Sequence, residues 1–225
     1  MGKGKNNEEL FRSMPVAQAI LTLAVPTVVS QIITIIYNMA DTFFIGQLGD
    51  PKQVAAATLA MPLFMFMTAL SNLFGVGGAS LISRFLGGGE REKASRCGAF
   101  CIWTAVAVSV LYGLMVLAGR PVLLPVLGAN EETCDMASSY LFWTIGLGAL
   151  PTVMNPALAH LIRSEGYSRQ ASLGVAFGGI LNMVLDPLFI YGLHLQITGA
   201  AVATLISNAT AMIYFLAFIW KMRGV

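Results

Sequence analysis

Residues 37–46 read YNMADTFFIG, and Asp41 is the one charged residue of a run that extends from Ser13 to Ile45. A helix rises about 1.5 Å per residue, so about 20 apolar residues cross a hydrocarbon core about 30 Å thick. Uncharged runs of sufficient length also occupy residues 53–83, 97–119 and 136–162. The segment 170–220 carries one formal charge, Asp186, and the turn-like GLHLQITG at 192–199 divides it in two. The pattern predicts several helices that cross a membrane.

The composition agrees with this interpretation, because 56% of the residues are hydrophobic, 11% are charged and the mean hydropathy is +0.75. These values argue against a water-soluble globule. We expect an all-α polytopic membrane protein, with an N-terminal tail at residues 1–14 and a six-helix lobe at residues 15–225. The six spans are predicted at about 15–45, 53–82, 94–118, 136–161, 171–191 and 199–220.

The distribution of basic residues predicts the orientation. Eleven of the 13 Lys and Arg residues fall in the N-terminal tail, the loops RFLGGGEREKASR and RSEGYSR, and the terminal KMRGV, whereas the opposite side holds Lys52 and Arg120. Cytoplasmic loops carry the excess of Lys and Arg, so both termini are expected in the cytoplasm and the protein in the cell (inner) membrane. The net charge of +2 is therefore a topology signal and not an indication of nucleic-acid binding.

Motifs for a cofactor or for enzymatic catalysis are weak. Cys97 and Cys101 are one helical turn apart while Cys134 lies on the other side, so they form neither a disulfide framework nor a zinc set. The glycines of GVGGAS and LGGGERE do not match a phosphate-binding loop. We expect no cofactor apart from a coupling ion, and no enzyme.

Two acids lie within the predicted spans, Asp41 and Asp186, and the other nine Asp and Glu residues lie in tails or loops. An acid at the centre of a membrane helix costs about 2.5 to 3.5 kcal/mol. Both lie near the outer, C-terminal end of a span that runs outward, where the helix dipole disfavours a carboxylate. No span offers a Lys or Arg partner, so we expect the pair to face each other and to bind a proton or a small cation.

Other polar side chains of these spans are placed at helical spacing, so that they share a helix face with the acids or with one another. In the first span they are Thr27, Gln31, Thr34 and Asn38. Asn182 precedes Asp186 by four residues, and Thr204 precedes Asn208 by four in the sixth span. These residues either line a polar cavity or make hydrogen bonds that hold the helices together.

Several segments together resemble one transporter family. They are PTVVSQIITIIYNMADTFFIGQLG, ISRFLGGGEREKA, LIRSEGYSRQA and LNMVLDPLFIYGLHLQITGAAVAT. In this combination the chain resembles the N-terminal half of the multidrug and toxic compound extrusion (MATE) family. The spacing of Asp41, Phe44, Ile45 and Leu48 also recurs at Asp186, Phe189, Ile190 and Leu193, as expected for a transporter built from helical repeats.

The resemblance implies a secondary antiporter that exports lipophilic or cationic compounds in exchange for protons or Na+. It implies twelve spans in two lobes, with ion coupling at Asp41, Asn182, Asp186 and Thr204, which could also hold Na+. The residues expected to line the cavity are Gln31, Thr34, Tyr37, Asn38 and Asn208. Pro26 corresponds to the proline at which the first helix is thought to bend.

Because the chain holds six spans, the expected partners are a second six-helix lobe or a second copy, besides the bilayer and amphiphilic or cationic small molecules. Two alternatives remain open at this stage. A flippase for lipids or polysaccharides would have a related architecture. An intramembrane aspartic protease would also use two acids, although its GxGD signature is replaced here by MAD and VLD.

Overall fold

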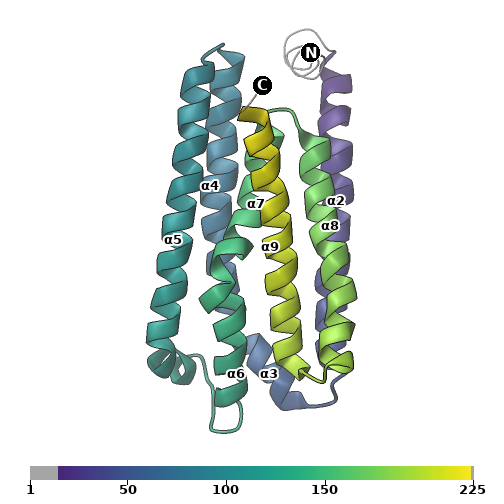
Figure 1. The fold of residues 1–225 in the computed structure, drawn as a ribbon, viewed down its shortest axis with the longest axis vertical. Helices are drawn as coiled ribbons and strands as arrows, with labels where there is room; N and C mark the ends of the chain where they lie inside the picture. Colours follow the sequence, from purple (N-terminus) through teal and green to yellow (C-terminus); the bar gives the residue numbers. More distant parts are fainter. Residues whose placement is uncertain (1–14, 224–225) are drawn as a thin grey trace.

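The computed structural model describes residues 15–223, which form a bundle of long helices (Figure 1). The helices are α2 (Val16–Gly46), α3 (Pro51–Leu59), α4 (Met61–Gly87), α5 (Arg91–Val126), α6 (Cys134–Leu141), α7 (Ala149–Ser164), α8 (Ser168–Pro187) and α9 (Gln196–Arg223), with two π-helical turns, η1 (Phe142–Leu147) and η2 (Leu188–Gly192). No β-strand occurs between residues 15 and 223.

The helices account for the six predicted spans. Five are long and apolar enough to cross a membrane, and α3 and α4 together make one of them, Pro51–Gly87. The sixth is a broken pair, because Cys134–Leu147 and Ala149–Ser164 are inclined by 48° to each other. Gly148 lies at this break, where a Cβ atom would come within 2.2 Å of the Thr144 carbonyl oxygen. The all-helical membrane fold predicted from the sequence is confirmed, and the break in the fourth span is an addition to it.

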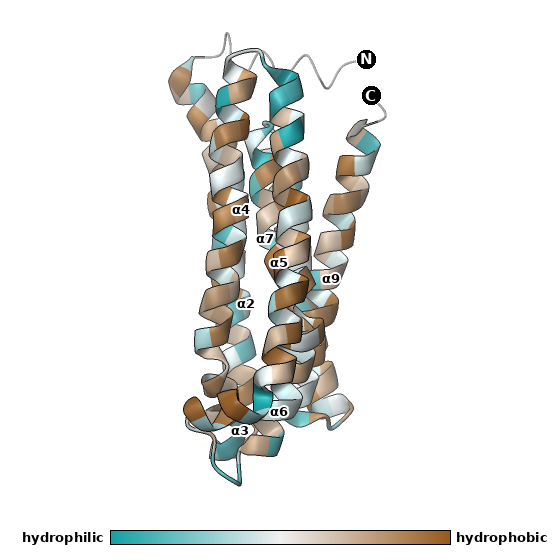
Figure 2. Ribbon diagram, turned by 90° about the vertical axis from the view of Figure 1, so that its left-hand side faces the viewer, coloured by the Kyte–Doolittle hydropathy of each residue, from teal (hydrophilic) through white to brown (hydrophobic). Residues whose placement is uncertain are grey.

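Helices α2 and α8 run in the same direction side by side, and α2 begins at the end of the bundle where α9 finishes (Figure 1). Hydrophobic residues are spread along the long helices (Figure 2), and many large ones are exposed. They include Trp103, Val122 and Trp220, each at least 70% exposed. Exposed apolar side chains on this scale are suited to contact with lipid.

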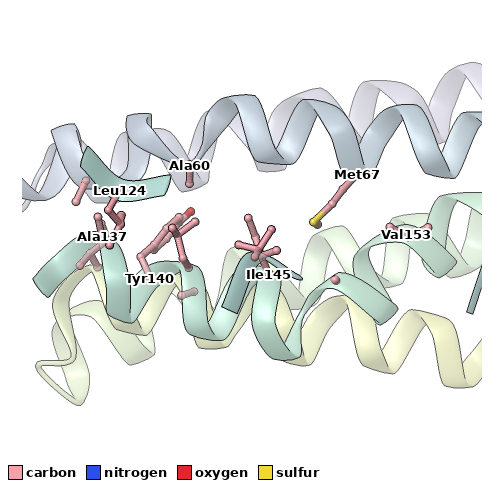
Figure 3. Close-up of a cluster of buried hydrophobic side chains, with 13 residues drawn as sticks. Ala60, Met67, Leu124, Ala137, Tyr140, Ile145 and Val153 are labelled. Atoms are coloured by element: carbon pink, nitrogen blue, oxygen red, sulfur yellow. The ribbon is translucent and has the colours of Figure 1, made fainter. Parts of the chain in front are cut away.

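Small residues bring the central helices close together. A Cβ atom at Gly75 of α4 would lie 2.9 Å from Cα of Ala157 on α7, which shows how near the two backbones are. Ala60, Tyr140 and Ile145, which are labelled in Figure 3, belong to the largest buried hydrophobic cluster and pack between the helices. Close packing of small residues is a usual source of helix association in membranes.

Helix α2 is packed less closely than the central helices, because it lies at the edge of the bundle and packs mainly along α8. Only 6% of its most apolar window is buried, against 33% for the span Ser168–Gly192. The position of α2 therefore depends chiefly on its contacts with one neighbour.

The orientation in the membrane can be tested by labelling single cysteines. In a variant with Cys97, Cys101 and Cys134 replaced by alanine, we expect a cysteine at Lys52 to react with an impermeant maleimide from outside intact cells. A cysteine at Arg91 should react only after the membrane is opened. Labelling of both positions from the same side would contradict the topology.

Candidate functional site

The candidate site is centred on Asp186, whose side chain is fully buried on α8. Asn182, one turn earlier, donates a hydrogen bond from Nδ2 to Asp186 Oδ1 at 3.0 Å. The same amide nitrogen lies 3.5 Å from Oγ1 of Thr204 on α9. Three of the four residues predicted to couple an ion are thus joined directly.

Asp41 approaches this group from α2. It lies between Tyr37, which is in contact with Gly179 of α8, and Ile45, which packs with Ile190, so α2 holds it beside Asp186. Asp41 Oδ1 and Asp186 Oδ2 are both buried and have no hydrogen-bond partner among the described residues. Neighbouring carboxylates repel each other, and their buried oxygens lose hydration, so a proton or a cation bound between them is favoured.

An apolar contact lies between the acids and the end of the bundle at which α2 finishes. Ile45, which follows Asp41 by one turn, packs with Ile190 and Ala200 in one buried cluster. Nearby, the hydroxyl of Tyr191 donates to the backbone oxygen of Phe44 at 2.7 Å. Ile45 and Ile190 are equivalent positions of the sequence repeat, and the fold brings them into contact on this side of the acid pair.

Tyr140 was not predicted to belong to the site. It is buried on α6, within electrostatic range of both Asp41 and Asp186. The sequence offered a weak signal, since Tyr140 is the one tyrosine of the fourth predicted span. The ring packs edge-to-face against Phe64 in the largest buried cluster, so Tyr140 lies near the acids, and among the described residues no hydrogen bond joins it to either.

The predicted cavity-lining residues divide into three kinds. Gln31 and Asn38 are exposed on α2, whereas Tyr37 is partly buried. Thr34 donates from its hydroxyl to the backbone oxygen of Ser30 in its own helix. Asn208 accepts a hydrogen bond from Asn155 Nδ2 at 2.7 Å and donates to Thr152 Oγ1 at 3.4 Å.

Asn208 therefore belongs to an amide cluster with α7. Asn155 was missed from the sequence, although its Oδ1 is buried and has no hydrogen-bond partner among the described residues. An asparagine in the middle of a predicted span was the available signal.

Pro26, the predicted hinge, lies inside α2, which continues through it from Val16 to Gly46. Proline lacks an amide hydrogen, so the helix loses the bond that residue 26 would donate to the carbonyl of Thr22. One turn later, Arg163 of α7 donates from Nη2 to Ser30 Oγ at 3.2 Å. The weakened turn is thus followed by a polar contact with the bundle.

The described residues do not contain a group of three or more His, Cys, Asp or Glu side chains placed to bind a metal ion together. The oxygen atoms available near the acids come from two carboxyl groups, a hydroxyl and an amide. Such a set can hold a proton, or a small monovalent cation in the manner of oxygen ligands.

Comparisons with known proteins agree on one group of transporters. Residues 26–188 match the family model described as MatE. The chain is 31% identical over 215 residues to the multidrug export protein MepA of Staphylococcus aureus (strain NCTC 8325 / PS 47). This alignment covers 96% of the chain and 48% of MepA.

Solved structures give the same result. The chain is 30% identical to a MATE protein in the straight conformation (TM-score 0.90) and in the bent conformation (TM-score 0.87). Each match covers 97% of this chain and 48% of the other. The chain thus spans about half the length of the relatives that it matches.

Proposed function

The chain belongs to the MatE family, and from this membership we propose that residues 15–225 form one lobe of an antiporter in the cell membrane. The proposed transporter exports lipophilic or cationic compounds in exchange for protons or Na+, and a second six-helix lobe, or a second copy, completes it. The observation that carries the proposal is the acid pair, in which each carboxyl group has one buried oxygen without a hydrogen-bond partner among the described residues. The family is one of transporters, so we do not assign the pair to peptide hydrolysis. Flipping of lipid or polysaccharide remains the alternative substrate class.

The exchange follows from the charge of the pair. While the carboxyl groups are ionised, they attract water and a cationic substrate into the polar region beside α2. When Asp41 binds a proton from outside, this attraction falls and the polar face of α2 can close. Because α2 packs mainly along α8, this movement disturbs few other contacts.

We propose the proton rather than Na+ as the coupling ion. Asn182 directs its amide nitrogen, and not its oxygen, towards both Asp186 and Thr204. A cation at that place would meet an N–H donor, whereas a carboxyl proton leaves the arrangement intact. Na+ could compete only if the amide turned over.

Efflux from proteoliposomes tests the function and the ion together. We expect the assembled transporter to expel ethidium when a proton gradient is imposed without sodium. Activity that appears only after sodium is added would overturn the proton assignment. Efflux at the same rate with and without a proton or sodium gradient would overturn the proposal of antiport. Lipid scrambling in the same vesicles would support the flippase.

Replacing Pro26 with alanine tests the hinge. We expect Pro26→Ala to slow efflux by about threefold or more, because the alanine amide restores the hydrogen bond to Thr22 and stiffens α2. Initial rates in proteoliposomes measure the effect. Val25→Ala is the control, because Val25 immediately precedes Pro26 and its side chain is exposed. An unchanged rate in Pro26→Ala would remove the hinge.

A further inference from the structure

Two adjacent glycines of α8 face two different helices. A Cβ atom at Gly178 would lie 3.1 Å from Cβ of Ala211 on α9. A Cβ atom at Gly179 would lie 2.7 Å from Cδ1 of Tyr37 and 3.4 Å from Cγ2 of Ile33, both on α2. The first contact is tight but short of a clash, whereas the second leaves no room for a methyl group.

The Gly179 contact lies close to the acids in both helices. Tyr37 precedes Asp41 by one turn of α2, and Gly179 precedes Asn182 by almost one turn of α8. On the other side of the acids, Ile45 and Ile190 pack together. The acid pair is therefore placed between two contacts of α2: an aliphatic one with η2, and one with α8 in which an aromatic ring lies against bare backbone.

We infer that Gly179 is a positioning residue: by leaving room for the Tyr37 ring, it sets how closely α2 approaches α8 and therefore how closely Asp41 approaches Asp186 and Asn182. The functional part of this inference rests on the proposed antiport. A side chain at position 179 pushes Tyr37, and α2 with it, away from α8. Few other contacts of α2 oppose such a shift, because it packs mainly along α8.

The consequence is a weaker attraction for the coupling ion. Two carboxyl groups that share a cation attract it less as they move apart, because the electrostatic energy falls with distance. The binding of a large substrate, which contacts many residues, should change less. Gly179 thus acts on ion affinity through the positions of other groups.

Spin labels can measure the helix separation in the purified chain in lipid nanodiscs. With the three cysteines replaced by alanine, labels are attached at Met39 of α2 and Val184 of α8, which are 68% and 60% exposed. We expect Gly179→Val to lengthen the mean distance by about 2 Å or more and Gly179→Ala to lengthen it less. Gly178→Ala, the matched control, should leave it unchanged. Adding Tyr37→Leu to Gly179→Val should restore the original distance.

Ethidium fluorescence in the assembled transporter gives the second readout. We expect Gly179→Val to need at least threefold more protons, or Na+ if that is the ion, to release half of the bound ethidium. The Kd for ethidium should stay within twofold. A general loss of structure would instead weaken ethidium binding itself.

The two readouts separate the possible failures. An unchanged label distance in both Gly179 variants, or an equal change in Gly178→Ala, would overturn the inference. A lengthened distance with an unaltered ion requirement would also overturn the role in ion affinity. If protons and Na+ fail to release ethidium from the unmodified assembled transporter, the proposed antiport fails, while the label distances still decide the positioning role.

Discussion

Replacing Asp41 with asparagine is expected to abolish ion-coupled efflux in the assembled transporter while leaving the fold intact. Asparagine has nearly the shape of a protonated aspartic acid but cannot release a proton, so the site should stay in its neutral state. We expect ethidium efflux driven by an ion gradient to fall by at least tenfold. The rate in proteoliposomes and the drug resistance of expressing cells measure the loss.

The neighbouring Thr42 provides a matched control for this change. Thr42 is exposed, and its hydroxyl donates only to the backbone oxygen of Asn38 in the same helix. Thr42→Ala should therefore transport at close to the normal rate. Normal resistance in cells that carry Asp41→Asn would show that coupling depends on other residues.

The second large effect is expected at Asp186, where stability and function should change in opposite directions. Asp186→Asn keeps the size of the side chain and removes a fully buried acid that has an unpartnered oxygen. A carboxylate loses hydration when it is buried and is repelled by a neighbouring carboxylate, and a neutral amide of the same size avoids both costs. We expect the midpoint of thermal unfolding to rise by several degrees and efflux to fall at least tenfold.

Ser71 is the control for the stability measurement, because its hydroxyl is also buried without a hydrogen-bond partner among the described residues. It lies on α4, and Ser71→Ala should leave efflux unchanged. If Asp186→Asn lowers the unfolding midpoint, the carboxyl group stabilises the fold and its functional assignment loses its main support.

The sequence predicted the features that depend on one residue and its immediate surroundings. An acid inside an apolar run, such as Asp41 or Asp186, is visible because the run itself shows that the residue is in a membrane. Helical spacing singled out Asn182 and Thr204, and the family resemblance assigned them to the site; the structure joins Asn182 to both Asp186 and Thr204. The number of spans followed from run length.

The features that were missed depend on contacts between spans. The fourth span changes direction by 48° near Gly148, and no periodicity in the sequence encodes that angle. Gly179 was indistinguishable from other glycines of α8 until its distance to Tyr37 was known. Gln31 and Asn38 share the polar face of α2, yet the described part of the bundle leaves them exposed.

The packing of α2 mainly against α8 also has a consequence during synthesis. Asp41 leaves the ribosome long before α8 exists, and at about 5 to 20 residues per second the delay to Asp186 is roughly 7 to 30 s. During this time the first helix carries its acid without Asn182, Asp186 or Thr204 beside it. The insertion machinery, or an early contact with other nascent helices, must shelter Asp41 from lipid until the fifth span arrives, so a nascent chain arrested before Ser168 should be a preferred target of membrane quality-control proteases.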